Sequence, residues 1–228
     1  MATKGIDKRK ALIIHAGMLF AEHGFDRVTT RMIAECAGVR VSAIHYHFAS
    51  KEDLYIEAFQ YAHDKDNRIN FLEVVAENPD RMKTPAGQAE IIRSTVIRYF
   101  KNIFDPDRPI WEKELLVREI VNPSSALPAM AKTFIESNVY NSEKFCSLIR
   151  PDMDENERAV WADTLFSHLF LYILARKQIE VVRGNDWLNQ DFFYKASRMI
   201  ARFMILELDL PLPEDLRKSQ AKEPAIDA

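Results

Sequence analysis

The chain has 228 residues, of which 47% are hydrophobic and 29% are charged, so it is long enough and apolar enough to bury a sizeable core. These values exclude collagen-like, disulfide-framework and wholly disordered proteins. The formal net charge of −3 gives no reason to expect a nucleic acid as partner, and the presence of only six glycines favours a mainly helical protein.

The first fifty residues predict three helices. Apolar residues with a period near 3.6 residues favour a first helix that ends at Gly24. A second, short helix follows a hydroxyl cap at Thr29 or Thr30 and ends at Gly38. A third short helix carries two apolar residues on one face. These helices are expected over residues 8–23, 31–37 and 42–48.

A long fourth helix is expected over residues 51–76, because Ser50 can cap it and two acidic residues stand in its first turn. Breaks with proline, asparagine, aspartate or glycine delimit five later helices, and no alternating pattern indicates a strand. From Pro211 on the chain is charged and lacks apolar periodicity, so we expect a disordered tail over 211–228. The five later helices are expected over residues 86–104, 109–121, 126–148, 155–182 and 190–208.

The two cysteines, Cys36 and Cys146, lack the spacing of a disulfide framework or a zinc site. We therefore expect two buried free thiols, no metal and no cofactor. The apolar run after the basic residues 8–10 is similar to a signal peptide, but His15 interrupts it and no cleavage site closes it. The longest uncharged apolar stretch elsewhere, Thr164–Ala175, is too short to cross a bilayer. These features indicate a cytoplasmic protein without a membrane partner.

The two short helices and the turn between them predict a helix-turn-helix, whose second helix would enter a DNA major groove. Between residues 31 and 51 there are three basic residues and one acidic residue, which suits a local phosphate contact. Arginine, lysine, tyrosine and histidine can hold phosphates, whereas arginine, serine and alanine at the entering end can read bases. The predicted DNA contacts are Thr30, Arg31, Arg40, Ser42, Ala43, His45, Tyr46, His47 and Lys51.

The first quarter of the chain resembles the signature of TetR-family transcriptional regulators. The resemblance is carried by Phe20-x-x-x-Gly24-Phe25, Thr29-Thr30-x-x-Ile33-Ala34-x-x-Ala37-Gly38-Val39 and Ile44-His45-Tyr46-His47-Phe48-x-Ser50-Lys51-Glu52-x-Leu54. Arg40, Ala43 and His45 depart from the residues usual at their positions, which bears on base preference. Further on, Arg118-Glu119-x-x-x-Pro123-x-x-Ala126 and the segment 168–187 resemble the CecR-like subgroup.

This resemblance implies an all-α homodimer that binds a double-stranded DNA operator. Its N-terminal three-helix helix-turn-helix DNA-binding domain would occupy residues 1–50. A C-terminal helical bundle in residues 51–210 would bind a small-molecule effector and form the dimer.

Aromatic residues are frequent between Tyr99 and Phe170, as in a bundle that encloses a cavity for a small, largely apolar molecule. For any one aromatic residue a place in the core is the alternative, and Arg118 could instead pair with Glu114. The predicted ligand contacts are Phe100, Phe104, Arg118, Phe134, Asn138 and His168.

The expected helices over 155–182 and 190–208 have apolar faces wider than a single bundle can bury, which favours a two-fold interface. Such a dimer would read a near-palindromic operator. The predicted interface residues are Trp161, Leu165, Leu169, Tyr172, Phe193, Ile200 and Phe203.

These patterns predict a ligand-responsive DNA-binding regulator. The family resemblance implies that it is a repressor and that the effector releases it from its operator. An enzyme is not expected, because His45 and His47 cannot share a helix face as metal ligands and no phosphate loop or nucleophile elbow is present. The remaining alternative is a helical protein-interaction adaptor without specific DNA binding.

Overall fold

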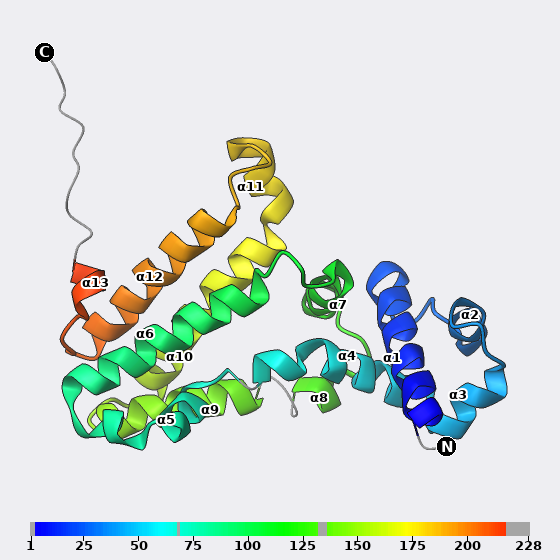
Figure 1. The fold of residues 1–228 in the computed structure, drawn as a ribbon, viewed down its shortest axis with the longest axis horizontal. Helices are drawn as coiled ribbons and strands as arrows, with labels where there is room; N and C mark the ends of the chain where they lie inside the picture. The colour runs from blue at the N-terminus through cyan, green and yellow to red at the C-terminus, as the bar shows by residue number, and fades with distance from the viewer. Residues whose placement is uncertain (1–2, 68, 132–135, 218–228) are drawn as a thin grey trace, which may run out of the picture. The chain divides into compact units, whose positions relative to one another are not determined.

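The computed structural model describes residues 3–67, 69–131 and 136–217, and every regular element within these ranges is helical (Figure 1). The predicted all-α fold is confirmed. The chain divides into two compact units, one of residues 1–68 and 105–138, the other of residues 69–104 and 139–228. None of the described helices is both long and apolar enough to span a lipid bilayer.

The first unit is built around α1, which packs against α2, α4 and α7. Figure 1 shows α2 and α3 on one side of α1 and α7 on the other. Its core includes Leu12, Phe20, Ile44 and Tyr55. The helices of this unit are α1 (Thr3–His23), α2 (Thr30–Cys36), α3 (Val41–His47), α4 (Lys51–Asn67), α7 (Ile110–Val121) and α8 (Leu127–Met130).

The division of the chain differs from the predicted boundary after residue 50. Leu54, Tyr55 and Ala58 on α4 are buried in the same core as α1, so α4 belongs to the first unit. Trp111 and Leu115 bring α7 into this core as well. The sequence pattern separates domains at polar breaks, and it does not show that a later helix packs back on the first one.

The helix-turn-helix has the limits that its capping residues predict, within one or two positions. The backbone N–H of Met32 donates to Thr29 Oγ1 (3.2 Å), which caps α2. Gly38 follows α2 with φ +64°, a conformation that favours glycine. The N–H of Asp53 donates to Ser50 Oγ (2.9 Å), which caps α4.

The second unit is built on the packing of α6 along α12. Its core includes Phe71, Phe100, Phe145 and Trp161, and Trp161 Nε1 donates to the carbonyl of Met204 (3.0 Å). The elements of this unit are α5 (Phe71–Glu77), a 3₁₀ turn (Pro79–Lys83), α6 (Pro85–Ile103), α9 (Glu136–Ile149, from residue 139 on), α10 (Glu155–Leu174), α11 (Arg176–Arg183), α12 (Gln190–Glu207) and α13 (Glu214–Arg217).

Two of the long helices expected from the sequence are broken. The segment 51–76 forms α4 and α5, because Asn70 is extended and caps α5 by accepting from the N–H of Glu73 (3.0 Å). The segment 155–182 breaks at Ala175 into α10 and α11, although no cap residue marks the break. The segment 126–148 contains α8 and α9, and residues 132–135 between them lie outside the described residues.

The prediction of a disordered tail is wrong for residues 211–217. Leu216 on α13 is buried in the core of the second unit. Asp215 accepts from Arg93 Nε (2.9 Å) and from Arg198 Nη1 (2.7 Å). One apolar anchor and one carboxylate between two arginines therefore hold a segment that has no apolar periodicity of its own. Residues 218–228 lie outside the described residues.

Candidate nucleic-acid interface and cavity

Helix α3 buries one side and presents the other to solvent. Ile44 is 1% exposed, whereas Tyr46 is 84% exposed. Arg40, which precedes the helix, and Ser42 and His45 are exposed as well. A seven-residue helix with one buried anchor and a polar outer side can enter a groove without losing its support.

The other predicted contacts lie at the edges of this surface. Thr30 begins α2 and is half-buried, and Arg31 Nε donates to Glu35 Oε1 (3.0 Å) on the exposed side of α2. Ala43 is half-buried. His47 is half-buried and its ring lies 4.9 Å from the ring of Tyr46. Apart from Lys51, the predicted contacts thus belong to α2, α3 and the turn between them.

Lys51 has partners within the chain. Its Nζ donates to the carbonyls of Phe25 (3.0 Å) and Val28 (3.1 Å) and lies 4.2 Å from the centre of the Phe25 ring. Two of the three N–H donors of this ammonium group therefore hold the loop between α1 and α2. The sequence gives no signal for these bonds, because the carbonyls stand more than twenty positions before Lys51.

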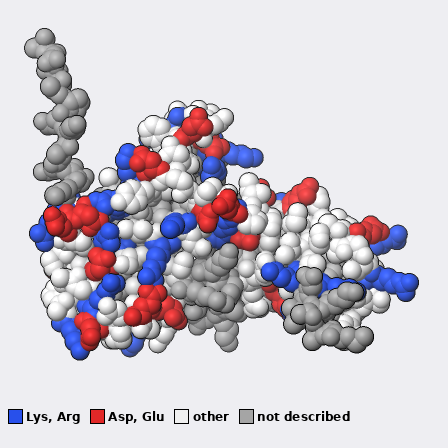
Figure 2. All heavy atoms as spheres, in the orientation of Figure 1, with Lys and Arg blue, Asp and Glu red and all other residues white. Residues whose placement is uncertain are grey.

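Arg9 is a basic residue near this surface that the pattern did not single out. It pairs with Glu57 on α4, and its guanidinium lies 5.0 Å from the centre of the buried Phe48 ring. The neighbouring Lys8 and Lys10 are exposed. Figure 2 shows Lys and Arg side chains with Asp and Glu among them over this part of the surface, at the right of the view. Arg9 thus fixes the first turns of α1 against the segment that joins α3 to α4.

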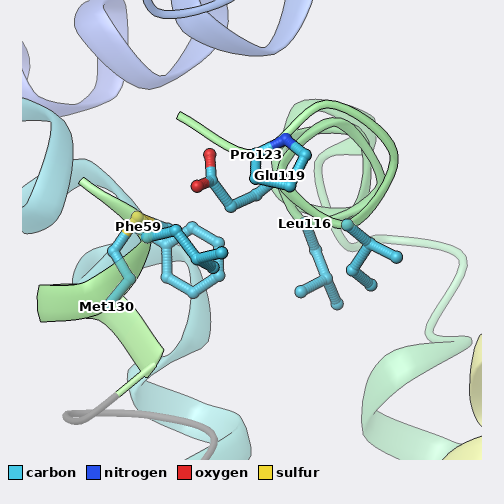
Figure 3. A pocket seen from close by; sticks show the side chains of 7 residues that line it. Phe59, Leu116, Glu119, Pro123 and Met130 are labelled. Atoms are coloured by element: carbon cyan, nitrogen blue, oxygen red, sulfur yellow. The ribbon is translucent and has the colours of Figure 1, made fainter. Parts of the chain in front are cut away.

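The first unit also contains a cavity of about 150 Å³ between α4, α7 and α8 (Figure 3). Its wall is almost wholly apolar, and Glu119 is the one ionisable residue that lines it. The lining residues are Phe59, Leu116, Glu119, Ile120, Pro123, Leu127 and Met130.

Glu119 is 3% exposed and is held by three donors. The Tyr55 hydroxyl donates to Oε2 (2.5 Å), and the N–H and hydroxyl of Ser124 donate to Oε1 (3.0 and 2.9 Å). Burial and the bond to Glu119 raise the pKa of the Tyr55 phenol, so the phenol stays a donor at neutral pH. The Tyr55 ring in turn contacts those of Phe20 (4.8 Å) and Phe25 (5.1 Å). A wall of the cavity is therefore bonded directly to the core of the helix-turn-helix.

None of the five predicted ligand residues that the structure describes lines this cavity. Phe100, Phe104 and His168 belong to the second unit, where Phe104 stacks on Phe193 at 3.8 Å and His168 Nδ1 contacts the carbonyl of Thr164 (2.7 Å). Phe100 and Phe104 are buried in the core of the second unit, and His168 is bonded within its own helix.

The other three predicted ligand residues belong to the segment 105–138. Arg118 donates to the carbonyls of Ala21 (2.8 Å) and Glu22 (2.7 Å) at the end of α1, and not to Glu114. Asn138 is half-buried, and Phe134 lies outside the described residues. The sequence pattern named Arg118 and missed its neighbour Glu119, although both stand in the motif of the CecR-like subgroup.

Most of the predicted interface residues are buried within the chain itself. Only Tyr172, half-buried, and Phe203, 52% exposed, retain surface. The apolar width of α10 and α12 is thus largely used in packing the second unit, because α12 lies on α6 and α10. The five buried residues are Trp161, Leu165, Leu169, Phe193 and Ile200.

Both cysteines are free, and Cys146 is buried as predicted. The prediction of a buried thiol is wrong for Cys36, which is exposed at the end of α2. Cys36 Sγ lies 3.4 Å from His15 Nδ1. Within the described ranges, no three His, Cys, Asp or Glu side chains lie close enough together to hold a metal ion.

Residues 13–58 match the model of the bacterial regulatory proteins of the tetR family. The chain is 32% identical over 130 residues to the HTH-type transcriptional dual regulator CecR of Shigella flexneri, a match that covers 55% of this chain and 57% of CecR. It is 30% identical over 108 residues to the HTH-type transcriptional repressor AcnR of Corynebacterium glutamicum, over 47% of each chain. The matches thus span about half the length of these relatives, both of which are named as transcriptional regulators.

Solved structures share the fold over nearly the whole chain. The SmeT–triclosan complex aligns with a TM-score of 0.61 at 15% identity, covering 97% of this chain and 100% of SmeT. AmtR of Mycobacterium smegmatis aligns with a TM-score of 0.59 at 16% identity, covering 91% and 89%. The N-terminal part of the chain, with its helix-turn-helix geometry and the matched segment 13–58, is thus similar to the bacterial regulatory proteins of the tetR family.

Proposed function

We propose that this protein is a transcriptional regulator that binds an operator through α3 and is controlled by a small molecule. The observation that carries the proposal is the outer side of α3, where Arg40, Ser42, His45 and Tyr46 are exposed around the buried anchor Ile44. Exposed arginine and serine can bond base edges, while tyrosine and histidine can donate to phosphates. Lys51 would add at most one donor to a phosphate, because its others hold the loop.

The test is a mobility-shift titration with the DNA that flanks the protein's own gene, at two salt concentrations. Tyr46→Ala should weaken specific binding about tenfold or more while leaving the fold intact, because this side chain is 84% exposed. Tyr194→Ala, which removes an exposed tyrosine of the second unit, is the matched control. Saturable binding that salt weakens supports the regulator. Weak binding that is equal for all fragments would favour the adaptor alternative.

We assign the effector to the cavity between α4, α7 and α8. Its wall is bonded through Glu119 and Tyr55 to the core that supports α3. An occupant that favours a different position of α7 or α4 would change the separation of two paired reading heads and release DNA. This control needs unequal binding to the two states, by about 1–3 kcal/mol for an ordinary response. That SmeT forms a complex with triclosan, a small molecule, supports this mode of control.

We further propose a repressor that acts as a homodimer on a palindromic operator. AcnR is named a repressor, whereas CecR is named a dual regulator, so repression has the more direct support. For the interface, α12 offers Met199, Phe203 and Leu206, which are exposed and share one helix face. α10 offers Leu171 and Leu174, also exposed. These side chains replace the five buried residues in our proposal for the interface.

A further inference from the structure

We infer that the cavity of the first unit selects a small organic cation, an amine on an apolar body. The inference rests on the proposed role of this cavity as the effector site and gives the effector a chemical class. It rests on the bonds and the surroundings of Glu119, the one ionisable side chain among those that line the cavity.

Glu119 accepts all three of the hydrogen bonds that it forms within the described residues. The Ser124 hydroxyl accepts from the N–H of Ala126 (3.2 Å), so its own hydrogen points to Glu119. Tyr55 and the Ser124 N–H are donors too, and three donors around two oxygens are the environment of an ionised carboxylate. Such a group offers about four acceptor positions, of which three are used.

In the part of the chain that the structure describes, no Lys, Arg or His side chain forms an ion pair with Glu119. All its bonding partners in the described residues are neutral, and the guanidinium of the adjacent Arg118 is bound to the carbonyls of Ala21 and Glu22 instead. The apolar wall limits screening by water, so a charge brought into the cavity interacts with the carboxylate more strongly than it would in solution. A cation is therefore favoured there, and an anion is repelled.

The remaining wall sets the size and polarity of the rest of the ligand. Phe59, Leu116 and Met130 present carbon and sulfur atoms (Figure 3), which suit an apolar body. Ile120 lines the cavity as well. A volume of about 150 Å³ is suited to a single aromatic ring rather than a large polycyclic drug. The amine group would bond Glu119, and the ring would lie against the side chains below it.

Occupancy has a path to the DNA-binding helices. A cation that bonds Glu119 competes with Tyr55 for the same carboxylate, and the Tyr55 ring packs on Phe20 and Phe25. A weaker Tyr55–Glu119 bond changes the packing of α4 against α1, on which α3 depends. The Tyr55–Glu119 hydrogen bond thus links the choice of ligand to the control of DNA binding.

The test compares three probes of nearly the same shape by calorimetry with the full-length protein in the absence of DNA. Benzylamine is a cation at neutral pH, benzyl alcohol is neutral and benzoate is an anion. We expect benzylamine to bind at least about tenfold more tightly than benzyl alcohol, and benzoate not to bind. Equal affinities of benzylamine and benzyl alcohol, preference for benzoate, or binding of none of the three would overturn the inference.

Three variants locate the effect. Glu119→Gln should abolish the preference for benzylamine over benzyl alcohol, whereas Glu114→Gln, which changes an exposed carboxylate of the same helix, should retain it. Leu127→Trp should fill the cavity and remove binding of both probes, and it leaves Glu119 and its donors in place. If Glu119→Gln does not fold, the ranking in the unchanged protein and the loss in Leu127→Trp still decide the matter.

Operator binding is measured separately, so that the two proposals fail in different ways. If benzylamine binds with the expected ranking and weakens operator binding, both proposals are supported. If benzylamine binds with the expected ranking but leaves operator affinity unchanged, the cavity is supported as an amine site and is refuted as the effector site. If none of the probes binds while the operator shift remains, the regulator stands and the inference on ligand class fails.

Discussion

At the residue scale, one buried hydrogen bond joins the cavity to the DNA-binding helices. Tyr55 and Glu119 stand 64 positions apart and are both buried, so each satisfies the other where water does not reach. Removing one partner leaves a buried polar group with a bond too few, which costs more than the bond itself contributes.

Tyr55→Phe tests the stability that this bond provides. We expect the free energy of unfolding to fall by about 1.5–3 kcal/mol, the usual range for a bond to a charged group. Tyr61→Phe, on the same helix but at an exposed position, should change it by less than about 0.5 kcal/mol. Denaturant titration of both variants gives the comparison. Equal stabilities would mean that Glu119 finds another donor in the folded protein.

Two glycines of the first unit adopt positive φ, and their surroundings differ. At Gly24 (φ +84°) an added Cβ would lie 3.3 Å from Arg118 Nη1, whereas at Gly38 (φ +64°) it would meet nothing within 4 Å. Gly38→Ala should therefore lose about 1–2 kcal/mol from backbone strain alone. Gly24→Ala should lose more, because the arginine that caps α1 must also move. Thermal unfolding of the two variants measures the difference, and an equal loss would show that Arg118 shifts without cost.

At the element scale, the sequence predicts a helix where its ends carry a local signal. Thr29, Ser50 and the pair Thr84–Pro85 mark starts that the structure places within one residue. The break at Ala175 has no such signal, so the pattern continued through it. The side of α3 that faces solvent also follows from local spacing, because Ile44 is the anchor.

Contacts between distant segments explain the site residues that the sequence did not give. The sequence predicts a DNA contact for Lys51 and an effector contact for Arg118. It does not show that both side chains bond backbone carbonyls, because these carbonyls stand far away along the chain. Glu119 was overlooked for the same reason, since its main partner is on α4. A sequence shows which groups carry charge, and only the fold shows which charges already have partners.

Helix α13 is held by the carboxylate of Asp215 between Arg93 and Arg198. Burial alone would raise the pKa of Asp215, but the hydrogen bonds and charges of the two arginines outweigh it and lower the pKa. A carboxyl whose pKa is lower in the folded state stabilises that state above its unfolded pKa, and this contribution is lost as the pH falls through the folded pKa.

We therefore expect α13 to open more readily as the pH falls below the ordinary carboxyl pKa and through the lowered pKa of Asp215. At neutral pH, Asp215→Asn should have the same effect and favour opening by about 1 kcal/mol, since the pair is partly screened by solvent. Hydrogen exchange of the amides of residues 214–217 measures the opening. Asp191→Asn, which removes an exposed pair with Lys195 on α12, should leave these amides unchanged. Unchanged exchange in Asp215→Asn would mean that the buried Leu216 alone holds α13.

At the scale of the whole molecule, each compact unit has its own core, and the two carry different proposed tasks. The first unit joins α3 and the cavity within one core, so the proposed effector and the DNA would act on the same packed side chains. The second unit leaves apolar side chains exposed on α10 and α12 after its core is complete. Rows of exposed apolar side chains on packed helices commonly form two-fold interfaces between subunits.

Phe203→Glu tests whether this surface forms the dimer and whether DNA binding depends on it. Phe203 is 52% exposed, so a carboxylate there should leave the chain folded yet oppose its own copy across a two-fold axis. Tyr194→Glu is the control, because it lies nine residues earlier, about two and a half turns, on the opposite side of α12 and is 53% exposed. Light scattering should find a monomer in the first variant and a dimer in the second.

The same pair of variants ties oligomeric state to operator affinity. Two α3 helices held by one dimer bind two half-sites at once, whereas a monomer binds each half-site alone and loses the gain from linkage. We expect the Phe203→Glu variant to bind a palindromic operator at least about a hundredfold more weakly, while its affinity for a single half-site stays that of the unchanged head. If the monomeric variant bound the full operator as tightly as the Tyr194→Glu dimer, the two heads would act independently. Control by the effector would then have to operate within one first unit, through Glu119 and Tyr55, and not through the spacing of two.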